Sequence, residues 1–489
     1  QNTPAVFYKY DAQTLPTGEP PGFNRGFSTG RLVAATYGTT TSSAGDYTGY
    51  DGLGRVSVSF QQTDSQNYGF SYGYDLASEM TTETYPSLRQ ITTAYDTAGR
   101  VSTINGQKTG EPNKTYASQF SYSPHGATAS ITLGNDLVER TDFNSRLQPT
   151  FIKLGTTSTP TSLLQLGYEY TSTCQTGNNG NVLKQTITAL GLSLTQNYCY
   201  DALNRIASAS ENSGANWTQT YGYDRWGNRW VSASTGYTLS SLTPTSSGAF
   251  NTTNNRLVMG PTHYDLAGNL DVDAQSRTFS YDGENRQITF NGTAGQYFYD
   301  GDGRRVKKID GSGTTIFVYN AGGQMIAEYH SDPVPPAAGG GGISYLTTDH
   351  LGSTRVVTKQ DGTVKVRYDY LPFGEELGVG IGGRTAGMGY SGADSTRQKF
   401  TQKERDSESG LDYFLARYYS AAQGRFTSPD KPFVNQLEND PQTWNLYMYA
   451  RCNPLLYVDP TGEDYVLYQY DKDGKVINTY QVRDIAALG

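Results

Sequence analysis

One short motif recurs along the first two thirds of this chain and constrains its fold more than any other feature. The motif begins with Tyr-Asp, continues through two or three variable residues to Gly or Asn, and then has Arg or Asn before an apolar residue. Adjacent copies follow one another at about twenty residues, which is the spacing of a repeat array rather than of unrelated turns. Seven copies keep the full order, beginning at Tyr50, Tyr95, Tyr200, Tyr223, Tyr264, Tyr281 and Tyr299, and degenerate copies begin at Tyr10, Tyr74 and Tyr122.

Each copy has the residues of a β-hairpin. Phe70, Tyr72 and Tyr74 alternate with other residues at period two, which is typical of an incoming strand. We expect each Asp to open the turn by accepting backbone N–H groups, and Gly or Asn to take the left-handed position. Because a single hairpin is marginally stable, the copies must pair side by side. Strands twist with a fixed hand, so the product is a long sheet that coils as it grows.

The composition agrees with an all-β chain. Hydrophobic residues make up only 35%, yet the chain has 39 Tyr, 56 Gly and 18 Phe. Tyrosine suits strands with one packed face, and glycine supplies turns. The net charge of −8 argues against a general nucleic-acid binder, which needs a basic face. No run of 18 apolar residues predicts a membrane span.

The cysteines and histidines predict no metal or cofactor. Histidine occurs four times, widely spread, with no Cys/His spacing typical of zinc and no phosphate-binding loop. Three cysteines do not make a disulfide framework. We expect Cys174, Cys199 and Cys452 to be partly buried free thiols, with a Cys174–Cys199 disulfide as the alternative.

Motif content divides the chain into four parts: a repeat array at 1–330, a Pro/Gly-rich loop at 331–342, a block at 343–463 and a tail at 464–489. The tail predicts one more hairpin, which is too short to be a folded domain of its own. Either the tail is the first segment of a payload, or the payload is absent from this sequence. The block at 343–463, called the core block below, contains longer strings: Tyr345–Arg355, Tyr368–Glu375, Phe400–Asp406, Gly410–Tyr419, Gly424–Asp430, Asn445–Ala450 and Asn453–Gly462.

These strings carry a family resemblance. The repeats from Tyr10 to Val306 resemble the Rhs/YD-repeat family, which includes bacterial Rhs toxins, toxin-complex shell proteins and, distantly, the teneurins. The core block resembles the Rhs repeat-associated core domain nearly word for word from His350 to Gly462. The resemblance implies an all-β fold in which hairpins form a continuous, spirally wound antiparallel sheet, a hollow shell or barrel-like vessel around a polypeptide payload.

The resemblance also implies partners and a location. The partner is the chain's own C-terminal polypeptide, together with a delivery-system or capping protein. The location is secreted, extracellular or at the cell surface, and the source is bacterial. An alternative function is an extracellular adhesion or filament-forming protein whose Tyr-rich faces bind glycans or a second copy.

In the family, the core domain ends in an aspartate-dependent self-cleavage site. The positions that match its two acids are Asp430 and Asp459, and the matching cut lies between Glu463 and Asp464. Two close carboxylates cannot both ionise, so one serves as acid and the other as base. Arg425 either tunes this pair or bonds to strand ends. An autoprotease is therefore the most that we expect by way of an enzyme.

Two departures from the family pattern weaken this assignment. The segment between the acids is longer than usual and contains Asn439-Asp440-Pro441, and Glu463 stands where the family has Leu. A charged residue would fit poorly in an apolar subsite at the cut. Turn capping explains both aspartates equally well, because Asp-Pro and Pro-Asp are ordinary turn pairs. Both interpretations stay open, and turn capping is preferred.

Overall fold

The computed structural model describes residues 3–11, 13, 19–38, 44–172, 174–212, 217–331, 342–390, 396–432, 441–463, 465–470 and 476–482. Strands account for 45% of the chain and helical turns for 4%. In this described part, no helix is long and apolar enough to cross a membrane. The predicted all-β class is confirmed.

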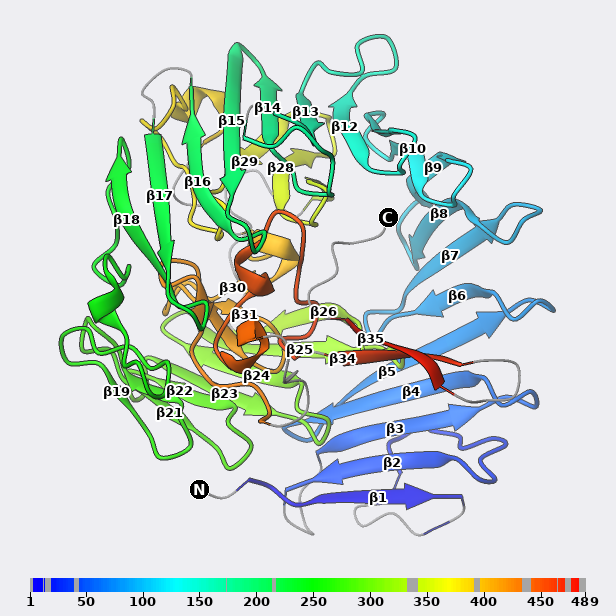
Figure 1. Cartoon of the computed structure of the whole chain (residues 1–489). Helices are drawn as coiled ribbons and strands as arrows, with labels where there is room; N and C mark the ends of the chain where they lie inside the picture. The colour runs from blue at the N-terminus through cyan, green and yellow to red at the C-terminus, as the bar shows by residue number, and fades with distance from the viewer. Residues whose placement is uncertain are drawn as a thin grey trace. The chain divides into compact units, whose positions relative to one another are not determined.

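One 18-stranded sheet contains β1 to β18. Consecutive strands pair, and the registered pairs are antiparallel, as in β1–β2, β2–β3, β3–β4 and β17–β18. Figure 1 shows β2 to β5 side by side in chain order. The sheet is not closed. Its strands are β1 (Val6–Tyr10), β2 (Leu32–Tyr37), β3 (Gly45–Tyr50), β4 (Val56–Thr63), β5 (Gln66–Tyr74), β6 (Met80–Thr84), β7 (Arg89–Tyr95), β8 (Val101–Lys108), β9 (Lys114–Tyr122), β10 (Thr128–Leu133), β11 (Val138–Phe143), β12 (Pro149–Gly155), β13 (Leu164–Glu169), β14 (Lys184–Ala189), β15 (Leu192–Tyr200), β16 (Ile206–Glu211), β17 (Trp217–Tyr223) and β18 (Arg229–Thr235).

Smaller sheets follow, again built from neighbours in the sequence. Their strands are β19 (His263–Tyr264), β20 (Leu270–Val272), β21 (Phe279–Tyr281), β22 (Gln287–Phe290), β23 (Gly295–Tyr299), β24 (Arg305–Asp310), β25 (Gly313–Tyr319), β26 (Met325–His330), β27 (Ser344–Thr348), β28 (Thr354–Lys359), β29 (Val364–Arg367), β30 (Glu404–Arg405), β31 (Asp412–Tyr413), β32 (Tyr418–Ser420), β33 (Arg425–Phe426), β34 (Tyr465–Tyr470) and β35 (Val476–Val482). The short 3₁₀ helices are η1 (Ser247–Ala249), η2 (Ala386–Met388), η3 (Phe400–Gln402), η4 (Pro441–Trp444) and η5 (Ala450–Cys452).

Contacts divide the chain into two compact units. The first comprises Gln1–Phe120 and Ser280–Gly341, and the second comprises Ser121–Phe279 and Gly342–Gly489. The boundaries drawn from motif content stay a prediction. Most of the predicted loop, from 332 to 341, lies outside the described residues.

The first unit packs β25 against β4 through a buried glutamine. Gln61 Nε2 donates to Phe317 O at 2.8 Å, and Tyr319 N donates to Gln61 Oε1 at 3.0 Å. Phe70, Ile316 and Val318 form an apolar cluster in the same unit. The Gln61 side-chain amide thus forms hydrogen bonds with a carbonyl and an N–H group of β25 that would otherwise be buried without a partner.

The second unit buries the core block against the long sheet. Its largest apolar cluster joins sheet residues such as Ile187 and Trp217 to Leu371 and Phe373 of the core block. A second, mostly aromatic cluster lies within the core block and centres on Tyr419, whose ring centroid is 4.6 Å from that of Tyr449. Packed aromatic rings therefore replace much of the aliphatic core that the composition lacks.

The Tyr-Asp turns have the predicted hydrogen bonds. Asp201 Oδ1 accepts Leu203 N at 2.9 Å and Arg205 N at 3.0 Å, and Asn204 takes a left-handed φ of 60°. Asp201 Oδ2 accepts Arg205 Nε at 2.8 Å. The aspartates of the other full copies also accept backbone N–H groups of their own turns: Asp51, Asp96, Asp224, Asp265, Asp282 and Asp300.

Successive repeats contact one another through arginine and tyrosine. Arg205 lies over the ring of Tyr223 at 4.4 Å from its centroid, and its Nη1 donates to Asp224 O at 3.3 Å. The Tyr223 hydroxyl donates to Ile206 O at 2.6 Å. The same stacking joins Arg55 to Tyr74 at 4.7 Å. In these repeats, the arginine of one turn holds the next repeat by a cation–π contact, and the tyrosine hydroxyl adds a hydrogen bond to the backbone.

The tyrosine is also where the strand register shifts. The pairing of β15 with β16 shifts between Cys199 and Tyr200, and that of β5 with β6 shifts between Gly73 and Tyr74. The shift recurs before Tyr50, Tyr95, Tyr299 and Tyr319. A β-bulge bends its strand and increases the local twist, so a bend recurs with the repeat.

The cysteines correct the expectation of three free thiols. Cys174 and Cys199 form a disulfide with a Cα–Cα distance of 5.6 Å, and Cys452 is free and buried. The bridge ties the segment before β14 to β15. Widely spaced cysteines give no sequence pattern for this pairing, which only the fold creates.

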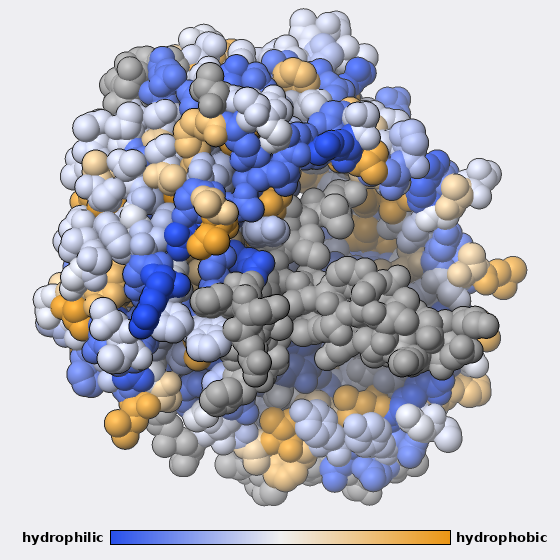
Figure 2. Space-filling view, viewed as in Figure 1, coloured by the Kyte–Doolittle hydropathy of each residue, from blue (hydrophilic) through white to orange (hydrophobic). Residues whose placement is uncertain are grey.

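On the face shown in Figure 2, apolar residues are scattered among hydrophilic ones. Several exposed leucines lie in the hairpin turns, namely Leu53, Leu76, Leu203 and Leu266. Scattered single apolar residues are normal for a protein surface and mark no interface by themselves.

We predict that Asp201→Ala lowers the free energy of unfolding by about 1–3 kcal/mol, because two backbone N–H groups and Arg205 lose their acceptor. Urea unfolding followed by tryptophan fluorescence measures the change. Asp142→Ala is the control, since Asp142 is half-exposed and forms a surface ion pair with Lys153. Equal midpoints for the two variants would show that the turn bonds contribute nothing beyond a surface ion pair.

Candidate functional site

The two aspartates singled out in the core block both face one arginine. Arg417, which immediately precedes β32, donates from Nη2 to Asp430 Oδ2 at 3.2 Å and to Asp459 Oδ2 at 3.5 Å. Its guanidinium carbon lies 3.8 Å from the ring centroid of Phe426 in β33. One buried cation therefore brings together two acids that are far apart in the sequence.

Each acid also accepts backbone N–H groups with its other oxygen, and Asp459 caps a local turn in this way. Asp459 Oδ1 accepts Gly462 N at 2.6 Å and Thr461 N at 3.1 Å. Asp430 Oδ1 accepts the N–H of Lys431 at 2.7 Å. Capping and pairing are thus compatible, because they use different oxygens of the same carboxyl group.

Burial sets the electrostatics of the pair. Asp459 is 2% exposed, and the side chain of Asp430 is 11% exposed. Burial raises the pKa of Asp459, and the Asp430 carboxylate adds to that rise, against the lowering effects of Arg417 and the backbone N–H groups. Burial therefore favours the protonated form of Asp459.

Lys403 lies on the other side of Asp459. Its Nζ donates to Pro460 O, and burial lowers its pKa while the charge of Asp459 opposes that shift. Lys403, Asp459 and Pro460 also line part of a cavity of about 1370 Å³ in the second unit. The remaining wall comes mainly from β10, β11 and the segments 348–352 and 455–458.

The segment after Asp459 turns tightly against Arg417. Gly462 has a φ of +74°, and a Cβ there would lie 2.5 Å from Phe414 O, so glycine is required. Arg417 Nε donates to Gly462 O. The Thr461 hydroxyl donates to Glu463 O at 3.0 Å, and Lys431 Nζ lies 2.7 Å from Glu463 Oε1. Asp464, predicted to follow the cut, lies outside the described residues.

Arg425 is placed elsewhere. It is buried, with Nη2 donating to Asn255 O at 2.6 Å and Nη1 to Asn228 Oδ1 at 3.4 Å, and it stacks near Tyr447. Sequence reasoning gave no role to Arg417 or Lys403. The signal for Arg417 was a lone charge inside the string Tyr413–Tyr419, which is otherwise aromatic and apolar.

No cluster of three or more histidine, cysteine, aspartate or glutamate side chains suited to a metal ion occurs where the structure describes the chain.

Comparison with solved structures gives the fold. A crystal structure of TcdB2–TccC3 matches 94% of this chain at a TM-score of 0.72 and 18% identity, and a TcdB2–TccC3–Cdc42 structure matches 89% at 0.71 and 19%. The chain covers 26% and 24% of those chains. Its fold is that of the Rhs/YD-repeat shell proteins.

Curated relatives are similar over shorter stretches. The tRNA3(Ser)-specific nuclease WapA of Bacillus spizizenii is 26% identical over 292 residues, which is 57% of this chain and 10% of the nuclease. Salivary gland surface protein 1 of Aedes aegypti is 31% identical over 132 residues, covering 27% of this chain and 3% of that protein. No family model matches the chain. The chain thus spans a small part of each relative's length.

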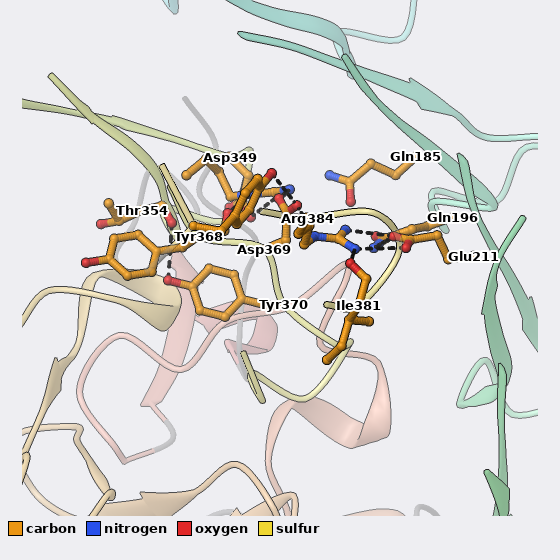
Figure 3. Close-up of polar contacts among 12 residues, drawn as sticks. Gln185, Gln196, Glu211, Asp349, Thr354, Tyr368, Asp369, Tyr370, Ile381 and Arg384 are labelled. Carbon is orange, nitrogen blue, oxygen red and sulfur yellow. Dashed lines mark hydrogen bonds and ion pairs between the residues drawn. The ribbon is translucent and has the colours of Figure 1, made fainter. Parts of the chain in front are cut away.

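A buried ion cluster fixes this Rhs-like core block to the long sheet. Figure 3 shows Arg384 of the core block between Asp369 and Glu211, which ends β16. Arg384 donates to Glu211 Oε1 and Oε2 at 2.8 Å each and to Asp369 Oδ2 at 2.7 Å. Burial alone would raise the pKa of Asp369, but Arg384 and Arg355 outweigh it and hold that pKa below its usual value.

We predict that Glu211→Gln lowers the free energy of unfolding by about 3–5 kcal/mol, because it removes one of the carboxylates that neutralise a fully buried arginine. Thermal and urea unfolding measure the loss. Glu169→Gln serves as the control, because that glutamate forms a surface ion pair with Lys184. A loss no larger than that of the control would show that Arg384 is neutralised without Glu211.

Proposed function

We propose that this chain is an Rhs-type scaffold that encloses or displays a C-terminal polypeptide and cuts its own backbone once, between Glu463 and Asp464. The observation that carries the proposal is the set of contacts of Arg417. This one buried side chain contacts Asp430, Asp459 and the carbonyl oxygen of Gly462, which immediately precedes the residue at the cut.

The proposed reaction is hydrolysis of one peptide bond. The Asp430 carboxylate takes a proton from water while the water oxygen bonds to the carbonyl carbon of Glu463. Protonated Asp459 gives its proton to the departing nitrogen of Asp464, so a carboxyl group and an amine result. The raised pKa of Asp459 and the greater exposure of Asp430 support this division of roles.

Two groups support the developing charge. The Thr461 hydroxyl already donates to Glu463 O, where negative charge forms as water attacks. Arg417 balances the two carboxylates and holds the turn through Gly462 O. The arrangement resembles the acid–base pair of an aspartic protease with the substrate covalently built in.

The comparisons support a toxin-related scaffold. The structural neighbours include a Photorhabdus luminescens Tc holotoxin pore that carries an aspartate-to-alanine mutation in TccC3, at a TM-score of 0.67 and 18% identity. The WapA relatives are named as tRNA nucleases. By analogy, we propose the polypeptide after Glu463 as payload, a delivery or capping protein as partner, and an extracellular or cell-surface location.

The adhesion or filament alternative has one observation in its favour. Edge strand β1 exposes Phe7, Tyr8 and Tyr10, side chains suited to stacking on sugar rings or on a second copy. Glycan binding or sedimentation as polymers by an uncut chain would favour it over the scaffold.

We predict that the purified wild-type chain is cut after Glu463, and that Asp430→Asn and Asp459→Asn each leave it whole, because one acid cannot play both roles. Intact-mass measurement under denaturing conditions detects the cut even if the fragments stay paired. Asp271→Asn, a change near exposed His263, is the control and should be cut like the wild type. A full-length wild-type mass would refute the proposed self-cleavage.

We predict that Thr461→Val slows cutting by about 10²-fold, the scale of one lost oxyanion donor. This slow variant can be purified whole and followed over time at different pH. The rate should fall as pH rises through the raised pKa of Asp459, because the acid form is lost. A rate that rises steadily with pH would contradict the role of Asp459 as acid.

A further inference from the structure

The residue at the proposed cut has a charged partner. Glu463 Oε1 lies 2.7 Å from Lys431 Nζ. Lys431 directly follows Asp430, and its backbone N–H donates to Asp430 Oδ1 at 2.7 Å. The same lysine thus contacts the proposed base through its backbone and the residue at the cut through its side chain.

Glu463 is also held through its main chain. Its carbonyl oxygen accepts the Thr461 hydroxyl at 3.0 Å, and its N–H donates to Thr461 Oγ1 at 3.3 Å. With the side chain tied to Lys431, both the position and the orientation of Glu463 are set. The carbonyl that water must attack is therefore fixed with respect to the segment that carries Asp430.

The ion pair lies at a solvent-facing rim rather than in an apolar pocket. The side chain of Lys431 is 67% exposed and that of Glu463 is 40% exposed. The family-based expectation that a charged residue fits poorly at the cut assumed an apolar subsite. Here the charge meets an opposite charge, and the carboxylate keeps contact with water.

We propose that Lys431 is the specificity-determining residue of the self-cleavage site, and that it selects an acidic residue at position 463. The proposal rests on the proposed function and adds the recognition of the residue before the cut. Lys431 is a positioning residue, because its side chain acts through Glu463 rather than on the reacting bond.

Because the Lys431–Glu463 ion pair is exposed, a positioning role can be distinguished from a role in stability. A surface ion pair contributes little to stability, so loss of the pair should leave unfolding almost unchanged. A small displacement of the reacting carbonyl nevertheless has a large effect on rate, since proximity and orientation dominate such reactions. The expected signature is a change in cutting rate without a change in thermal unfolding.

The experiment follows cutting of newly made full-length chain in cell-free synthesis, by intact mass over time. Lys431→Glu and Glu463→Lys should each slow cutting by about tenfold, and the double variant should recover to within about twofold of the wild type. The same exchange in the Lys184–Glu169 pair, which has a similar combined exposure, should change nothing. Slowing without recovery, or no slowing, would overturn the proposal.

A leucine at the cut gives the sharpest comparison. In Glu463→Leu, the further change Lys431→Glu should leave the rate unchanged, and 1 M salt should slow the wild type but not Glu463→Leu. An equal effect of Lys431→Glu on both chains would reduce Lys431 to a structural role. If the wild type is never cut, the proposed function fails; if it is cut at a rate independent of Lys431, only this inference fails.

Discussion

The structure depends on the contact between the arginine of one turn and the tyrosine of the next. Arg205 donates from Nε to the Asp201 carboxylate, stacks on the ring of Tyr223 and donates from Nη1 to Asp224 O. Asp201 therefore has two roles. It accepts the backbone N–H groups of its own turn, and it orients the Arg205 side chain toward the neighbouring repeat. This link adds to the backbone pairing that joins successive hairpins, each of which is too small to be stable alone.

The composition of the chain explains what fills its interior. A chain with 35% hydrophobic residues cannot fill its core with aliphatic side chains. It uses aromatic clusters around Tyr419 and buried charges around Arg384 instead. A buried ion pair is demanding in geometry, because an unmatched charge is costly, and so it favours one register of the core block on the sheet over others.

The features that could be predicted from the sequence are those that depend on residues close together in the chain. The Tyr-Asp turns and the consecutive pairing follow from residue types within one repeat, and both were found. The bulge that recurs before many of these tyrosines was not foreseen, because it is a property of paired strands rather than of one strand. Asn144, Asn320 and Asp349 make the same turn in segments that lack the Tyr-Asp signature.

At the candidate site, sequence strings identified Asp430 and Asp459 but assigned no role to the arginine between them. Motif position favoured Arg425, which is eight residues closer than Arg417 to Pro429-Asp430, yet its side chain donates to Asn228 and Asn255. Which arginine reaches the acids depends on how the short strands β31, β32 and β33 pair with one another. Strands that short leave no periodic pattern in the sequence, so only the folded chain reveals Arg417.

The consecutive pairing of β1 to β18 has a consequence for timing. Each strand finds its partner in the stretch just made, so the sheet can grow from its first strand while the ribosome is still at work. Glu211 and the strands that pack on the core block are then in place before Arg384 is synthesised, and Asp459 is synthesised later than Arg384. The bond proposed to be cut would then stay inert in the nascent chain and become a substrate only when the scaffold around it is complete.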